Sequence, residues 1–283
     1  MTTFGERVRA VLDERGPLCV GIDPHLPLLG SWGLEASAAG AREFGLRVVD
    51  AAAGRVGIVK PQVSFFERFG SRGLAALEEV IAAARAAGLL VIADAKRGDI
   101  GSTMDAYAAA WLEPGSPLEA DALTASPYLG VGALDGAFSL ADAHGKGVFV
   151  LAATSNPEAA ALQRGRSADA TIAAAVVAEV SARNARVAAP GEWGSTGFVI
   201  GATVDWDGAG LAPFAPPAPI LAPGFGYQGA QAGDLAAVFG RMAPCVIASE
   251  SRSILAAGPE GIAAAVAAAA AAYRGDENGG PVA

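Results

Sequence analysis

Residues 89–103 read LLVIADAKRGDIGST, an apolar run that ends in charged residues. Such a run, which contains β-branched residues, is typical of a buried parallel strand. Residues two apart on a strand share a face, so we expect Asp94 and Lys96 to point the same way, with Asp99 in the following loop. Burying three charges beside an apolar strand is costly unless a ligand uses them. The stretch therefore predicts a functional site rather than a surface ion pair.

The same kind of short apolar run recurs along the chain and predicts eight parallel strands. Because the strands alternate with segments that favour helices, at about 35 residues per unit, the pattern predicts βα units. A count of eight favours closure into a (β/α)8 TIM barrel of the α/β class, with its chemistry at the rim where the strands end. The other predicted strands cover residues 18–25, 56–62, 122–128, 147–154, 197–203, 218–222 and 245–249, the predicted helices include 41–53, 72–87, 168–187 and 253–273, and 26–40 is expected to be a loop.

Length and composition indicate one soluble domain. The 283 residues fit a single barrel, so we expect one domain over residues 1–274 and a disordered polar tail over 275–283. No apolar run reaches the roughly 20 residues that a membrane span needs, and residues 1–10 lack the apolar core of a secretory signal. Cys19 and Cys245 lie in apolar runs, which favours reduced thiols and a cytoplasmic location. The net charge of -9 argues against nucleic acid or an anionic membrane as a partner.

Two further charged residues end predicted strands. Lys60 ends the second strand, next to the third in a sequentially wound barrel, and would form an array of alternating charge with Asp94 and Lys96. Asp23 ends the first strand; taken alone, it is as compatible with a turn before a proline as with ligand binding. With two histidines and no cysteines at ligand spacing, a metal site built from His or Cys is not supported.

Two segments near the end of the chain favour binding of a phosphate group. The loop over residues 223–230 is rich in glycine and follows the seventh strand, and Arg252 follows the eighth. Loops at these places in barrels often bind phosphate through backbone N–H groups, a helix N-terminus and a cation. The combination therefore predicts a phosphate site, although Glu250 is an unexpected neighbour for an anion. Residues 154–157, TSNP, end the fifth strand as a polar cluster that alone indicates a turn.

The third strand and its loop resemble the signature of the orotidine 5'-phosphate decarboxylase family, in the subgroup that reads D-x-K-R-G-D-I-G-x-T. All the fixed positions are present between Asp94 and Thr103, and the resemblance extends from Gly21 to Ser253. It implies a (β/α)8 barrel that converts orotidine 5'-phosphate to uridine 5'-phosphate and CO2 in de novo pyrimidine biosynthesis, without metal or cofactor. One departure is Gln62, where many relatives carry asparagine.

The resemblance also implies four catalytic residues, namely Lys60, Asp94, Lys96 and Asp99. Lys96 would stabilise the carbanion left at C6 when CO2 departs, and would then protonate that carbon. Asp94 and Asp99 would hold Lys96 in place and keep it charged. Asp99, together with Thr103, is expected to reach into the active site of the other subunit, so the working unit is expected to be a homodimer.

Substrate contacts are implied at the ends of other strands. The residue at the pyrimidine edge is expected to be Ser155, with Thr154 or Asn156 as alternatives one position away. A mobile loop at about residues 225–234 would grip the phosphate, so that binding energy from this remote group serves the reaction at C6. The expected substrate-binding residues are Asp23 at the ribose, Thr103 from the partner, Ser155, Pro223, and Gln228 and Arg252 at the phosphate.

Two other functions stay open on the sequence alone. One is a Mg2+-dependent decarboxylase or aldolase of the same suprafamily that acts on a sugar phosphate. Its chemistry needs a metal-binding carboxylate after the second strand, and its pattern lacks the Arg-Gly-Asp-Ile-Gly continuation. The other is a catalytically silent barrel that binds nucleotides, for which a second lysine aimed at the pyrimidine carbon would serve no purpose.

Overall fold

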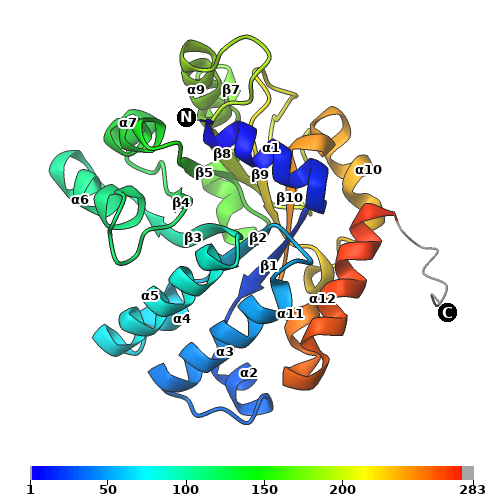
Figure 1. Cartoon of the computed structure of the whole chain (residues 1–283). Helices are drawn as coiled ribbons and strands as arrows, with labels where there is room; N and C mark the ends of the chain where they lie inside the picture. The colour runs from blue at the N-terminus through cyan, green and yellow to red at the C-terminus, as the bar shows by residue number, and fades with distance from the viewer. Residues whose placement is uncertain (1, 276–283) are drawn as a thin grey trace.

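The computed structural model describes residues 2–275, and it contains the predicted barrel (Figure 1). Eight parallel strands close in the order β1-β2-β3-β4-β5-β8-β9-β10. Nearly all of their residues are buried, which is why each strand is a continuous apolar run in the sequence. Each of these eight barrel strands overlaps a predicted one, so the fold prediction is confirmed. The strands are β1 Leu18–Ile22, β2 Ile58–Pro61, β3 Leu90–Arg97, β4 Ala122–Ala125, β5 Gly147–Ala153, β8 Thr196–Ile200, β9 Ile220–Pro223 and β10 Val246–Glu250.

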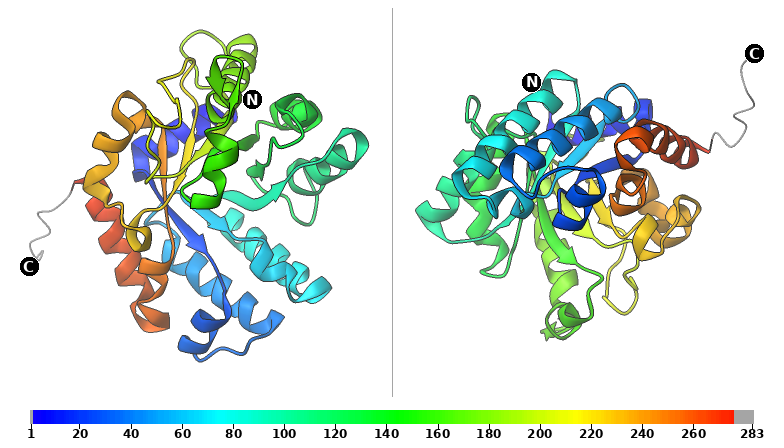
Figure 2. Two further views of the ribbon diagram at one scale, coloured as in Figure 1. Left: turned by 180° about the vertical axis from the view of Figure 1, so that it is seen from behind. Right: turned by 90° about the horizontal axis from the view of Figure 1, so that it is seen from below.

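Helices form a layer around the outside of the barrel (Figure 2). The α-helices of the described residues are α1 Phe4–Arg15, α2 Leu26–Ser31, α3 Ala38–Ala52, α4 Ser64–Glu67, α5 Gly70–Ala86, α6 Gly101–Leu112, α7 Asp135–Ala143, α8 Ala160–Gln163, α9 Ile172–Val187, α10 Leu235–Phe239, α11 Arg252–Leu255 and α12 Gly258–Arg274. The 3-10 helices are η1 Val131–Leu134, η2 Pro157–Ala159, η3 Gly226–Gln228, η4 Ala232–Asp234 and η5 Gly240–Cys245, and a hairpin joins β6 Arg166–Ser167 to β7 Ala170–Thr171.

α1 closes the end of the barrel at which the strands begin. Its Phe4 ring meets the ring of Phe149 on β5 edge to face, with the centroids 5.9 Å apart. The backbone N–H of Gly5 donates to the hydroxyl of Ser195, just before β8 (3.3 Å). These contacts cover the barrel interior at that end, whereas the opposite end, where the strands finish, stays open.

Three predictions about helices need correction. The segment 26–40 was expected to be a loop but contains the six-residue helix α2. Its proline lies in the first turn, where a proline favours a helix because the missing N–H would have no partner there. α9 begins at Ile172 rather than at residue 168, because the preceding residues form the β6–β7 hairpin and the hydroxyl of Thr171 caps the helix. The last predicted helix is two helices, α11 and α12, with a break before Gly258, whose φ of 72° suits a glycine.

β3 is irregular at the charged stretch. Ala93 pairs with Leu123 of β4 and Arg97 pairs with Ala125, so four steps along β3 match two steps along β4. Within this bulge Lys96 has a φ of 47°, in the left-handed region that residues other than glycine rarely adopt. Asp94 and Lys96 converge as expected, but a bulge between them, rather than regular alternation, brings them together.

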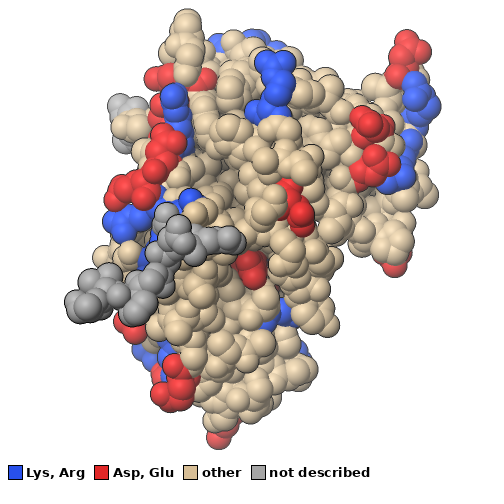
Figure 3. All heavy atoms as spheres, turned by 90° about the vertical axis from the view of Figure 1, so that its right-hand side faces the viewer, with Lys and Arg blue, Asp and Glu red and all other residues tan. Residues whose placement is uncertain are grey.

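Charge on the face shown in Figure 3 is spread out rather than gathered in one patch. Basic and acidic side chains lie among broad uncharged areas there. Such uncharged areas are expected from helices that are rich in alanine, such as α12, whose sequence is GPEGIAAAVAAAAAAYR. None of the helices within residues 2–275 is both long enough and apolar enough to cross a membrane. The part of the predicted tail over residues 276–283 lies outside the described residues.

Candidate active site

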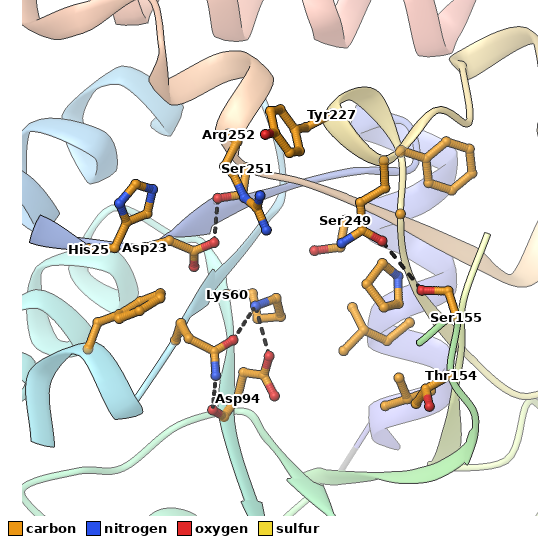
Figure 4. Close-up of a pocket in the computed structure, with 18 of the residues that line it drawn as sticks. Asp23, His25, Lys60, Asp94, Thr154, Ser155, Tyr227, Ser249, Ser251 and Arg252 are labelled. Carbon is orange, nitrogen blue, oxygen red and sulfur yellow. Dashed lines mark hydrogen bonds and ion pairs between the residues drawn. The ribbon is translucent and has the colours of Figure 1, made fainter. Parts of the chain in front are cut away.

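A cavity of about 920 Å³ opens where the barrel strands end (Figure 4). Every barrel strand except β4 contributes to it, either from its last residues or from the loop that follows. Asp99 and Thr103 do not line the cavity of their own chain; Asp99 is half-buried and bonded to the backbone N–H of Ile100 (2.8 Å), and Thr103 is exposed on α6. The predicted site residues that line it are Asp23, Lys60, Asp94, Lys96, Ser155, Pro223, Gln228 and Arg252.

Asp94 lies between the two lysines and binds both. Its Oδ2 accepts from Lys60 Nζ at 3.0 Å and its Oδ1 accepts from Lys96 Nζ at 2.6 Å. The side chains of Lys60 and Asp94 are only 7% and 9% exposed, whereas the side chain of Lys96 is 47% exposed. The result is a fixed, buried ion pair with one further ammonium that is open to the cavity.

The charges of this array keep one another ionised. Burial by itself would raise the pKa of Asp94, but the charges of Lys60 and then Lys96 outweigh it and hold that pKa well below its usual range. Burial would likewise lower the pKa of Lys60, but the nearby charges of Asp94 and Asp23 hold it above its usual range. The buried pair therefore stays charged at neutral pH.

Two residues without a predicted role support the array. The hydroxyl of Thr124 on β4 donates to Asp94 Oδ1 and accepts from the backbone N–H of Lys96, both at 2.9 Å. Gln62 lines the cavity, accepts from Lys60 Nζ at 3.4 Å and donates to the backbone carbonyl of Asp94 at 3.3 Å. A hydroxyl inside a fully buried strand was the one signal in the sequence that could have identified Thr124.

One wall of the cavity carries an unsatisfied acceptor. Asp23 Oδ2 accepts from the hydroxyl of Ser251, whereas Asp23 Oδ1 is buried and has no partner within the described residues. Gly21 leaves room for this pair, because a Cβ there would lie 2.7 Å from that of Ser251. His25 stands beside them, and burial lowers its pKa more than the charge of Asp23 raises it. This wall can accept a hydrogen bond from a ligand hydroxyl.

The side of the cavity where a phosphate site is predicted offers a free cation. The guanidinium of Arg252, at the start of α11, lies 4.4 Å from the ring centroid of Tyr227 in η3, and no ion pair within residues 2–275 occupies it. Glu250, whose negative charge was unexpected next to a predicted phosphate site, does not line the cavity. Its carboxylate accepts instead from Ser253 at 2.6 Å and from Tyr273 at 3.2 Å. The cation therefore remains available to an anion.

Three polar residues follow β5 on the wall opposite Asp23 (Figure 4). The hydroxyl of Thr154 donates to Asn156 at 2.7 Å and accepts from Gln163 at 2.9 Å, so it is already paired. The hydroxyl of Ser155 donates to Gln228 Oε1 at 3.4 Å and thereby links this wall to the loop after β9. Of the three alternatives, Ser155 is the residue whose hydroxyl faces that loop.

The side chains of the described residues do not form a set of metal ligands. Within residues 2–275 no three His, Cys, Asp or Glu side chains lie close enough together to hold a metal ion. The polar groups at the floor of the cavity are two ammonium groups and one carboxylate, already bound to each other. The arrangement presents positive charge, rather than metal ligands, to a bound molecule.

Comparisons with known proteins agree with this geometry. Residues 16–270 match the family model of the orotidine 5'-phosphate decarboxylase / HUMPS family. The chain is 56% identical over 264 residues to the orotidine 5'-phosphate decarboxylase of Salinispora tropica, and 51% identical over 265 residues to that of Corynebacterium glutamicum, covering 93% and 92% of those proteins and 93% and 91% of this chain.

Solved structures give the same result. A crystal structure of a Streptomyces avermitilis protein superposes with a TM-score of 0.91 at 47% identity, over 97% of this chain and 96% of that one. The Leishmania donovani OMP decarboxylase superposes with a TM-score of 0.75 at 32% identity, over 96% and 99% of the two chains. The resemblance found in the sequence is thereby confirmed, and the chain belongs to the orotidine 5'-phosphate decarboxylase / HUMPS family.

Proposed function

We propose that this chain catalyses the decarboxylation of orotidine 5'-phosphate to uridine 5'-phosphate and CO2, the corresponding step of de novo pyrimidine biosynthesis, without metal or cofactor. The observation that carries the proposal is the Lys96 ammonium, which Asp94 holds at 2.6 Å while it stays open to the cavity. The family to which the chain belongs and the two curated decarboxylases at 56% and 51% identity support the same function.

In the proposed reaction, Lys96 acts on the electron pair that CO2 leaves behind. When the bond from C6 to the carboxylate carbon breaks, the pair remains on C6 in an sp2 orbital that the ring cannot delocalise. An ammonium at about 4 Å stabilises this charge by about 4 kcal/mol at an effective dielectric constant near 20. Lys96 then gives a proton to C6, and its exposure to solvent allows it to be protonated again.

The remaining cavity residues orient the substrate in this proposal. The unpaired Oδ1 of Asp23 accepts a ribose hydroxyl, and Ser155 bonds the pyrimidine edge. Gln228 and Arg252 bind the phosphate, and Pro223, the last residue of β9, lines the same cavity and contacts the substrate. The loop over residues 225–234 would close over the phosphate, so that remote binding energy serves the step at C6.

The function is tested by following the ultraviolet absorbance of orotidine 5'-phosphate with the purified protein, with and without a chelator. We expect conversion to uridine 5'-phosphate that the chelator leaves unchanged. No conversion by the wild type would contradict the proposal and leave a silent nucleotide-binding barrel. If the protein instead converted a sugar phosphate, and only in the presence of Mg2+, the metal-dependent alternative would be favoured. The described residues offer no cluster of ligands for that metal.

Replacing Arg252 by alanine is expected to raise KM for orotidine 5'-phosphate by about 10- to 100-fold, because a charge-assisted hydrogen bond to the phosphate is lost. Turnover of orotidine, which lacks the phosphate, should change by less than about twofold. Steady-state kinetics with both substrates measure the difference. Arg241→Ala, which removes an exposed arginine outside the cavity, is the matched control. An equal loss with both substrates would argue against a phosphate contact.

We also propose that the chain works as a homodimer in which Asp99 and Thr103 reach the partner's cavity. An exposed apolar patch next to these two residues supports this proposal. Three residues of the patch lie in the loops after β3 and β4, which are neighbours because the Ser126 N–H donates to the Arg97 carbonyl at 2.7 Å, and the fourth, Tyr107, lies on α6. The patch consists of Ile100, Tyr107, Tyr128 and Leu129.

Mixing two inactive variants tests the shared site. Asp99→Ala lacks the carboxylate that each subunit would place in its partner's cavity. Lys96→Met lacks the ammonium that each subunit would place in its own cavity. With free exchange of subunits, half of the dimers are mixed and each has one complete site, so we expect about a quarter of the wild-type activity. Activity measured after dilution from mild denaturant gives the answer. A mixture as inactive as its parents would rule out a shared site.

Two further features of the chain are part of the proposal. We propose a cytoplasmic location, supported by two buried free thiols at Cys19 and Cys245. We also propose that residues 1–274 form one domain, supported by the closure of the barrel between β1 and β10.

A further inference from the structure

Thr124 is a buried polar residue that the reaction, as described so far, does not use. It lies in the middle of β4, is 0% exposed and does not line the cavity. Its hydroxyl nevertheless touches two parts of the array, the carboxylate of Asp94 and the main chain of Lys96, both at 2.9 Å.

The chemistry of the three groups fixes the direction of these hydrogen bonds. A backbone N–H can only donate, so the Thr124 oxygen accepts from Lys96. The ionised carboxylate of Asp94 can only accept, so the single proton of the hydroxyl points to Asp94 Oδ1. The same Oδ1 accepts from Lys96 Nζ at 2.6 Å. The three residues therefore form a closed ring of hydrogen bonds that leads from the main chain of Lys96 back to its ammonium.

The backbone of Lys96 needs such a restraint. Its φ of 47° is disfavoured for a residue with a long side chain and persists only where the surroundings hold it. Thr124 lies between the two β4 residues, Leu123 and Ala125, that pair with Ala93 and Arg97 on either side of the bulge. It is thus the β4 residue that faces the irregular part of β3.

We propose that Thr124 is a positioning residue, whose hydroxyl joins the left-handed backbone of Lys96 to the carboxylate of Asp94 and so aims the ammonium at the reacting carbon. The inference rests on the proposed function, because it assigns Thr124 an effect on the same chemical step. A misplacement of the ammonium by a fraction of an ångström weakens the stabilisation of the carbanion but leaves substrate binding intact.

Gln62 gives a comparison within the same site. It also joins Lys60 to Asp94, but its two hydrogen bonds are longer, at 3.4 and 3.3 Å, and its side-chain partner is the buried lysine, Lys60, rather than Lys96. Thr124 is the residue that contacts the main chain of Lys96 itself. Removing the hydroxyl of Thr124 should therefore lower the rate of the chemical step without destabilising the rest of the barrel.

The experiment compares Thr124→Val, which keeps the shape and removes the hydroxyl, with Thr124→Ser, which keeps the hydroxyl. We expect valine to lower kcat for orotidine 5'-phosphate by about 10- to 100-fold with KM changed by less than about threefold. Serine should recover most of kcat. Thr196→Val is the matched control, because Thr196 is a buried threonine of β8 outside the cavity, and its kcat should stay within about threefold of the wild type. Thr124→Ala replaces the valine variant if valine prevents folding.

Crystal structures of the wild type and of Thr124→Val, both without substrate, supply a readout that does not depend on activity. We expect Lys96 in the variant to leave the left-handed region or its ammonium to move away from Asp94. A wild-type kcat in folded Thr124→Val, equal losses in the serine and valine variants, or an unmoved Lys96 would each overturn the inference. An inactive wild type would refute the proposed function instead, and the crystal structures would still decide the role of Thr124.

Discussion

Lys96→Met is expected to lower kcat/KM for orotidine 5'-phosphate by on the order of 10⁵-fold. The loss of about 4 kcal/mol of charge stabilisation accounts for about three orders of magnitude, and the loss of a positioned proton donor accounts for at least two more. Methionine keeps the length and the apolar part of the side chain. Because the lysine side chain is 47% exposed, its replacement should leave the barrel folded.

Two measurements separate a chemical loss from unfolding. The decarboxylation assay gives the rate, and urea unfolding followed by tryptophan fluorescence gives the free energy of unfolding. Arg72→Met removes an exposed cation of α5 outside the cavity and should keep the wild-type rate. A Lys96→Met variant that is folded and within tenfold of the wild-type rate would refute the role given to Lys96.

Asp94→Asn should damage both activity and stability. We expect kcat to fall by on the order of 10³-fold, because the ammonium of Lys96 loses its partner at 2.6 Å. We also expect the free energy of unfolding at pH 7 to fall by about 3–5 kcal/mol, because Lys60 is left buried without its counter-charge. Asp13→Asn, at an exposed position on α1, is the matched control for stability.

The difference in the free energy of unfolding between the wild type and Asp94→Asn should become smaller at low pH. The pKa of Asp94 is lower in the folded protein than in the unfolded chain, so its contribution is complete above the unfolded value of about 4. That contribution is lost as the pH falls below about 4 toward the depressed folded value. Urea unfolding of both proteins at pH 7 and pH 3 should therefore show the gap becoming narrower at pH 3. A gap that stays the same would mean that folding does not lower the pKa of Asp94.

The barrel and most of the site were predictable because both follow from local patterns. Strands buried on both faces must be continuous apolar runs, and this was visible for all eight. In a parallel barrel the strand ends meet at one rim, so charges such as Lys60 and Asp94, which follow such runs, had to come together. The order of the strands along the chain then decided which charges became neighbours.

The features that escaped prediction depend on contacts between distant segments. The hydrogen bond between Ser251 and Asp23 joins residues 228 apart in the sequence. The bulge in β3 depends on its pairing with β4, and the role of Thr124 depends on that bulge. Helix α2 was missed for a different reason, because six residues with a proline and a glycine carry too little periodicity to identify a helix.

The unequal exposure of the two cavity lysines has a consequence for chemical labelling. The chain has only three lysines, and two of them, Lys60 and Lys146, are buried and hydrogen-bonded to carboxylates. Among the lysine amines, Lys96 is therefore the one that an acylating reagent meets first. Coupling this protein to a resin or a dye through lysine would modify the ammonium that we propose acts on C6, whereas chemistry directed at arginine or carboxylate side chains has many exposed targets away from the cavity.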